Sequence, residues 1–218
     1  MKRAAVLHAS RAAVDCVAEY YAAQAPEIEF THLLDDGVMR MLNAKDWSRA
    51  GNRLVRMAEE ARGEYGVTQA VLTCSAYPPD ALAALKNAAP VPMFKLDEPM
   101  ARQAVATGRR IAILSTFPST RETARELVLG AASAAGAQVD LIEELDYDAL
   151  RALLGGDRET HDARFRAACE RLAAQKPDVL VLAQVSMARL KPDAARITGV
   201  PVLESLSSSL EELRSRMA

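Results

Sequence analysis

The 218-residue chain is poor in cysteine, with only Cys16, Cys74 and Cys169. An odd number without framework spacing argues against a disulfide-stapled extracellular domain and fits a reducing compartment. No cysteine pair has zinc-site spacing, and H-E-x-x-H, G-x-G-x-x-G and Walker glycine motifs are all missing. Since nothing in the sequence requires a metal, nucleotide or flavin, we expect no cofactor and no metal site.

Long apolar runs and a strong net charge are missing as well. No segment approaches the roughly 18 to 20 apolar residues of a membrane span. The apolar part of the basic opening is four residues long before His8, too short for a signal peptide. The formal net charge of −2 provides no electrostatic footprint for nucleic acid or anionic lipid. We therefore expect a cytoplasmic protein that binds neither nucleic acid nor membrane, and the sequence leaves open whether it is a homo-oligomer.

The most informative stretch that is present runs from Ala70 to Asp80. Its apolar start ends abruptly in Thr73-Cys74-Ser75, and a Pro-Pro-Asp helix start follows. This pattern predicts a buried parallel strand that brings a thiol and two hydroxyls to the carboxyl edge of a sheet. Open α/β folds bind their ligands at that edge.

A second stretch, residues 179–193, repeats this organisation. Gln184 follows its apolar run 110 positions after Cys74, and Pro192-Asp193 stands where Pro79-Asp80 stood. Further pairs lie at nearly the same offset, among them Asp35 with Asp146 and Val91-Pro92 with Val200-Pro201. Several correspondences in the same order indicate an internal duplication.

The predicted fold class is α/β, with two duplicated, pseudo-symmetric domains. Each has a central parallel sheet of about four strands flanked by helices. Strands are expected at residues 3–8, 27–34 and 91–94 and at the Cys74 stretch, then at 110–115, 138–145 and 200–203 and at the Gln184 stretch. We expect residues 1–97 plus 204–218 to form the first domain, which carries Cys74, and residues 98–203 the second, which carries Gln184. A short crossover near residues 96–100 joins them, and a cleft between them is the expected ligand site.

Cys74 is the strongest chemical candidate. A thiol at a strand end, ahead of a helix N-terminus, is favoured as the thiolate, which is a nucleophile or an acid/base. The alternative is a small buried packing residue, which we expect for Cys16 and Cys169. Hydroxyl groups beside helix N-termini suit a carboxylate, although Ser10 and Thr120 would also serve as helix caps. Of the histidines, His8 ends a strand and is a candidate second acid/base, whereas His32 and His161 are expected to be structural.

The duplicated domains, the thiol loop Thr73-Cys74-Ser75 and the mirror loop at residues 182–187 resemble the aspartate/glutamate racemase superfamily. That group includes glutamate, aspartate and hydantoin racemases, maleate isomerase and arylmalonate decarboxylase. The resemblance implies cofactor-independent proton transfer by thiols, usually one from each half, with hydroxyls and backbone amides holding a carboxylate. Cys74 matches the first thiol position. Gln184 occupies the second, and a carboxamide only hydrogen-bonds near neutral pH.

The prediction is therefore a cofactor-independent racemase or isomerase of this superfamily, acting on a small carboxylate or amino-acid derivative. Cys74 and Gln184 are its predicted catalytic residues. The predicted substrate-binding residues are Ser10, Ser75, Ala76, Thr116, Ser119, Thr120, Val185 and Ser186. A decarboxylase or lyase, and a catalytically silent carboxylate-binding protein, are the alternatives. The sequence leaves the substrate and the stereochemistry open.

Overall fold

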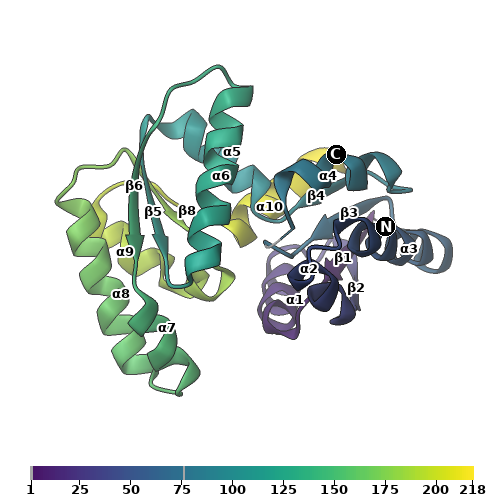
Figure 1. The fold of residues 1–218 in the computed structure, drawn as a ribbon, viewed down its shortest axis with the longest axis horizontal. Helices are drawn as coiled ribbons and strands as arrows, with labels where there is room; N and C mark the ends of the chain where they lie inside the picture. Colours follow the sequence, from purple (N-terminus) through teal and green to yellow (C-terminus); the bar gives the residue numbers. More distant parts are fainter. Residues whose placement is uncertain (1, 76) are drawn as a thin grey trace. The chain divides into compact units, whose positions relative to one another are not determined.

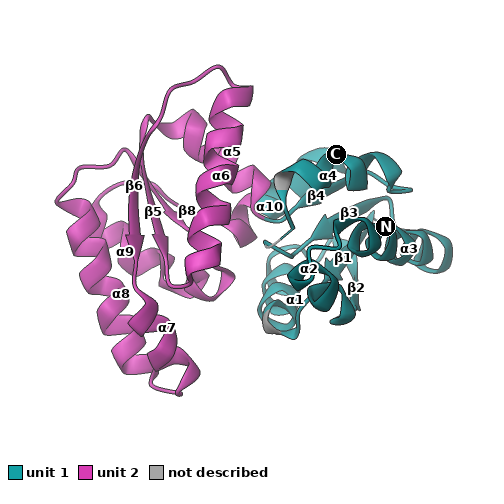
Figure 2. Cartoon of the chain, in the orientation of Figure 1, with its two compact units in different colours: residues 1–96, 209–218 teal, residues 97–208 magenta. Residues whose placement is uncertain are grey.

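The computed structural model describes residues 2–75 and 77–218. The chain forms two compact units, Met1–Leu96 with Ser209–Ala218 (unit 1) and Asp97–Ser208 (unit 2), which are coloured separately in Figure 2. The boundary on the C-terminal side falls within the last helix. Among the described residues, no helix has both the length and the apolar character needed to cross a membrane.

Unit 1 is built on a four-stranded parallel sheet (Figure 1). Its strands are β1 (Lys2–His8), β2 (Ile28–Leu34), β3 (Gln69–Leu72) and β4 (Met93–Lys95), in the order β2-β1-β3-β4. The central strands β1 and β3 are almost continuous apolar runs because helices cover both of their faces.

In the described part of the chain, the α-helices of unit 1 are α1 (Val14–Gln24), α2 (Gly37–Asn43), α3 (Trp47–Tyr65), α4 (Pro79–Ala88) and residues 209–216 of α10 (Ser205–Arg216). One face of the sheet packs against α2, α3 and α4 through a cluster that includes Leu7, Leu54 and Leu72. The other face packs against α1 and α10, where the Tyr21 hydroxyl lies 2.8 Å from Ser209 Oγ. On that side Arg216 stacks over the ring of Phe94.

Unit 2 repeats the topology. Its parallel strands are β5 (Arg110–Ser115), β6 (Asp140–Leu145), β7 (Val179–Leu182) and β8 (Val202–Glu204), in the order β6-β5-β7-β8. Helices α8 (Arg158–Ala173) and α9 (Lys191–Thr198) pack on one face, and α5 (Glu98–Thr107) and α6 (Pro118–Ala134) on the other. The helix α7 (Tyr147–Leu154) and the 3₁₀ helix η2 (Val185–Leu190) complete the unit.

Backbone hydrogen bonds show which residues of the two units correspond. Thr73 N–H donates to Leu7 O at 3.0 Å, and Ala183 N–H donates to Leu114 O at 3.0 Å. Cys74 and Gln184 are the next residues on each side, so they occupy equivalent positions. The ion pairs Asp35–Arg53 and Asp146–Arg164 also recur, and in both the partners are 18 residues apart. The predicted fold class is confirmed.

The structure differs from the sequence expectation at the expected crossover. Residues 98–107 form α5, where we expected only a short connection around Pro99. Pro99 lies in the first turn of this helix. A backbone N–H in the first turn has no hydrogen-bond acceptor within the helix, so proline, which lacks this group, is tolerated there. The helix follows β4 of unit 1 but packs on the sheet of unit 2, just as α10 follows β8 and ends on the sheet of unit 1.

Candidate active site

The thiol of Cys74 lies at the carboxyl end of β3, as the sequence predicts. Side chains alternate along a strand, and Cys74 falls on the same face as Leu72, in the apolar cluster formed with α2, α3 and α4. Its Sγ lies 3.8 Å from Met39 Sδ, and 7% of the residue is exposed. Tyr77 N–H donates to Cys74 O at 3.3 Å. We call Cys74, Ser75 and Tyr77 together the thiol turn.

Tyr77 anchors this turn in the apolar core. It is 1% exposed, and its hydroxyl donates to Trp47 O at 3.5 Å. Burial raises the pKa of Tyr77, and the charge of the nearby Cys74 thiolate raises it further. Gly51 of α3 allows this packing, because a Cβ atom there would lie 2.9 Å from the tyrosine hydroxyl.

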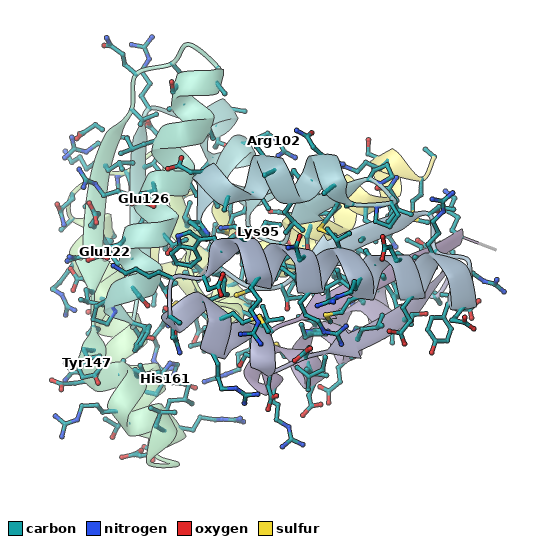
Figure 3. The ribbon with its side chains drawn as sticks, turned by 45° about the vertical axis from the view of Figure 1, so that its right-hand side comes forward. Lys95, Arg102, Glu122, Glu126, Tyr147 and His161 are labelled. Carbon is teal, nitrogen blue, oxygen red and sulfur yellow. The ribbon has the colours of Figure 1, made fainter. Side chains whose placement is uncertain are left out.

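Lys95 fixes the turn from the end of β4, and sequence reasoning missed it. Its side chain (Figure 3) is fully buried, and Nζ donates to Ser75 O at 3.3 Å and to Tyr77 O at 3.4 Å. The available signal was a single charged residue in the apolar strand-like stretch Val91–Leu96.

His8 lies in a hydrogen-bonded chain with Thr73 and His32. The Thr73 hydroxyl is 3.3 Å from Leu7 O and 3.1 Å from His8 Nδ1, and His8 Nε2 is 3.0 Å from His32 Nδ1. A carbonyl oxygen only accepts, so the hydroxyl donates to Leu7 O and accepts the His8 Nδ1 proton. His8 Nε2 then accepts the Nδ1 proton of His32. The two imidazole rings are stacked with centroids 5.3 Å apart.

This chain lies on the opposite face of the sheet from the Cys74 side chain. Thr73 directly precedes Cys74, and neighbouring residues of an extended segment point to opposite faces. His8 is completely buried, and its pKa is lowered to about 4, first by burial and then by His32. His8 is therefore neutral at physiological pH, and its role as a second acid/base stays a prediction.

Gln184 occupies the equivalent position in unit 2 and is tied to Thr116. Its Oε1 accepts from Thr116 N–H at 2.8 Å, and its Nε2 donates to Thr116 Oγ1 at 2.8 Å. Thr116 is buried and Gln184 half-buried. The carboxamide has no titratable proton near neutral pH, so it can orient a ligand by hydrogen bonds but cannot accept a proton from carbon.

The other predicted contact residues follow strands β1 and β3 in unit 1 and strands β5 and β7 in unit 2. Ser10 and Ser75 of unit 1 are half-buried, and Ala76 lies outside the described residues. In unit 2, Val185 and Ser186 begin η2. Ser119 and Thr120 lie inside the first turn of α6, which starts at Pro118, so Thr120 is not its N-cap. The cleft expected to join the two sets of residues stays a prediction.

The other two cysteines have environments unsuited to a reactive thiol. Cys169 is fully buried in the core of unit 2, and burial raises its pKa to about 12, with a further contribution from Asp193 and Glu170. Burial also raises the pKa of Cys16, together with the charges of Glu19 and Asp15. Both observations agree with the packing role that the sequence suggested.

Unit 1 has two surface hollows, one beside Tyr77 and one beside His32. One, of about 350 Å³, lies between α3 and α4 and is lined in part by Trp47, Gly51 and Tyr77. The other, of about 390 Å³, lies between α1 and β2 and includes Phe30 and His32. Over residues 2–75 and 77–218, no three His, Cys, Asp or Glu side chains are grouped as metal ligands would be.

The fold and the two strand-end loops define a duplicated α/β protein with a thiol at one loop and a carboxamide at its counterpart. A family model described as Asp/Glu/hydantoin racemase matches residues 3–213, and the chain belongs to this family. The resemblance inferred from the sequence is thereby confirmed. A search of curated protein sequences finds no match.

Solved structures of the same fold include racemases and a decarboxylase. An allantoin racemase from Klebsiella pneumoniae is 20% identical with a TM-score of 0.70, covering 99% of this chain and 87% of its own. A glutamate racemase from Bacillus anthracis is 17% identical with a TM-score of 0.70, covering 99% and 81%. An unliganded arylmalonate decarboxylase is 16% identical with a TM-score of 0.61, covering 100% and 93%. At these identities the likeness concerns the fold alone.

Proposed function

We propose that the protein is a cofactor-independent isomerase that moves a proton at the carbon next to the carboxylate of a small acid or amino-acid derivative. The observation that carries the proposal is the position of Cys74 at the carboxyl end of β3 in a chain of the racemase family. The neighbouring hydroxyls and backbone amides would hold the carboxylate while the thiolate acts on the α-carbon.

In the proposed reaction the Cys74 thiolate takes the α-proton and becomes a thiol. The electron pair of the C–H bond passes into the carboxylate as an enolate, whose oxygens need hydrogen-bond donors. Return of the proton from the same thiol restores the starting enantiomer, and solvent exchange at sulfur labels it. Inversion needs a donor on the opposite face, and Gln184 in its pairing with Thr116 has no titratable proton to supply.

Hydrogen exchange compared with inversion tests this assignment. Enantiomerically pure aspartate, glutamate, allantoin and 2-arylpropionates are incubated in D₂O, and NMR measures α-deuteration while chiral chromatography measures inversion. We expect one enantiomer of the substrate to incorporate deuterium much faster than it inverts. Equal inversion of both enantiomers would refute the role of Gln184 and require another second base.

Two variants separate the proposed roles. Cys74→Ser should abolish exchange, because a serine hydroxyl has a pKa too high for it to act as the base, while the cooperative thermal unfolding stays close to that of the wild type. Gln184→Cys restores a second thiol and should raise inversion relative to exchange. Cys16→Ser serves as the matched control and should leave exchange unchanged. Undiminished exchange in Cys74→Ser would refute the assignment of the base.

A decarboxylase is the second candidate, favoured by the similarity in fold to arylmalonate decarboxylase and by the single thiol. Release of CO₂ from phenylmalonate that depends on Cys74 would support it over isomerisation. Binding of carboxylates by calorimetry, with neither exchange nor CO₂ release, would instead indicate a catalytically silent binding protein.

A further inference from the structure

Lys95 is an unusual residue to find in the interior of this fold. It is fully buried at the end of the edge strand β4, where an ammonium group loses its hydration and needs compensating acceptors. Two of the acceptors of Lys95 are Ser75 O and Tyr77 O, both in the thiol turn. The buried cation is therefore placed against the segment that carries Cys74.

The duplication shows that the fold itself does not require a lysine at this strand position. The register pairs Leu72 with Lys95 in unit 1 and Leu182 with Glu204 in unit 2, so Glu204 is the counterpart of Lys95. Glu204 is also buried, and its carboxylate accepts from Leu206 N–H at 2.6 Å and Ser207 N–H at 2.9 Å, at the start of α10, and pairs with Lys191 Nζ at 3.6 Å. At this strand position the unit with the thiol has a buried cation, and the unit with the carboxamide has a buried anion that pairs with Lys191.

Both Cys74 and Lys95 belong to the α3–α4 side of the sheet. Met93, two residues before Lys95, packs in the same apolar cluster as Cys74, and side chains two apart in a strand share a face. Few water molecules can screen a charge in this environment, so its effect on a neighbouring ionisable group is stronger than at the surface. A cation beside a thiol favours the thiolate.

We propose that Lys95 is a positioning residue for Cys74, which holds the thiol turn by two carbonyl groups and supplies the positive charge that favours the thiolate. The inference rests on the proposed function, since it concerns the group to which proton transfer is assigned. It adds a cation to a site in which the strand-end motifs contain only a thiol, hydroxyls and a carboxamide.

The test is the pH dependence of Cys74 alkylation by iodoacetamide in the full chain, with peptide mass spectrometry to separate Cys74 from Cys16 and Cys169. The midpoint of the profile reports the charge environment of the thiol, and the plateau at high pH reports its accessibility. In Lys95→Met the midpoint should move to higher pH. At pH 7 alkylation should be about tenfold slower, as expected for each unit by which the pKa of a thiol rises.

Lys95→Gln separates the charge from the hydrogen bonds, because a carboxamide can still donate to a turn carbonyl but is neutral. The midpoint should move in this variant too, while the plateau stays close to that of the wild type. Glu204→Gln is the matched control: it neutralises the corresponding buried residue of unit 2 and should leave the Cys74 profile unchanged. An unchanged midpoint in both Lys95 variants, or an equal shift in Glu204→Gln, would overturn the proposal.

Folding is measured alongside by thermal unfolding followed by circular dichroism. If Lys95→Met does not unfold cooperatively, Lys95→Gln carries the test. Failure of both to fold would assign Lys95 to the stability of unit 1 alone and would overturn the proposal. The titration needs no substrate, so the two proposals can fail separately. A shifted midpoint without deuterium exchange would refute the proposed function but leave the role of Lys95 intact. Deuterium exchange with an unshifted midpoint would refute the role of Lys95 but leave the proposed function intact.

Discussion

The buried His8–His32 pair should make the protein sensitive to mild acid. The unfolded chain has a histidine pKa near 6.5, and burial lowers the pKa of His8 to about 4 in the folded state. Between these values the unfolded state binds more protons than the native state. The free energy of unfolding therefore rises with pH in this window, and the stabilisation is complete above 6.5 and lost as the pH falls toward 4.

The size of the effect follows from the two pKa values. Between pH 7.5 and pH 5.0, His8 alone should lower the free energy of unfolding by about 2 kcal/mol, and the loss should level off near about 3 kcal/mol below pH 4. His32, whose pKa is also lowered by burial, adds to the loss. The carboxyl groups contribute little above pH 5, because their ordinary pKa values lie near 4.

The assay is urea unfolding at pH 7.5 and 5.0 for the wild type and His8→Gln. Glutamine does not titrate, and its amide can still donate or accept a hydrogen bond. The variant should be less stable at pH 7.5, since it loses part of the chain with Thr73, but its stability should change by about 2 kcal/mol less between the two pH values. His161→Gln is the control for loss of a buried histidine in unit 2.

Direct titration provides an independent check. The chain has three histidines, so the imidazole C–H signals in NMR can be assigned from the His8 and His161 variants. A His8 signal that titrates near 6.5, or a His8→Gln variant with the pH dependence of the wild type, would refute the reasoning. Either result would mean that protonated His8 is accommodated in the folded state.

The remaining predictions concern the other thiols and the packing of α10. Iodoacetamide near pH 8 should modify Cys74 first and Cys169 last, because Cys169 is fully buried with its pKa raised to about 12, and faster labelling of Cys169 would contradict the site assignment. Cys169→Ser should lower the free energy of unfolding by about 1–3 kcal/mol, measured by urea unfolding, because it buries a hydroxyl group in the core. An unchanged free energy of unfolding would show that the core provides this hydroxyl with a hydrogen-bond partner. In unit 1, Tyr21→Phe and Ser209→Ala should each cost about 1 kcal/mol, and their double variant less than the sum, because they share one buried hydrogen bond. Strict additivity in that cycle would contradict the packing of α10 on this sheet.

Much of the fold is encoded locally and was therefore predictable. The apolar runs that end at Leu72 and Leu182, with polar residues and a proline-marked helix start after each, identify the central strands. The near-constant offset between the halves predicted the duplication, and the register confirms it by placing Cys74 and Gln184 at equivalent positions. The order of residues along the chain suffices to predict these elements, because strand periodicity and helix boundaries depend on neighbouring residues.

Other features depend on contacts between residues far apart in the chain, and only the tertiary structure decided them. Gln184 and Thr116 are 68 residues apart, and their pairing depends on the position of β7 beside β5. His8 ends β1 and Cys74 follows β3, but the two-residue alternation places their side chains on opposite faces of one sheet. In the sequence, Lys95 resembles any charged residue at a strand end. Only the tertiary structure buries it and places two carbonyls of the thiol turn within its reach. The sequence determined which groups reach the carboxyl edge of each sheet, and the packing of helices on both faces decided which of them are buried, paired and neutral.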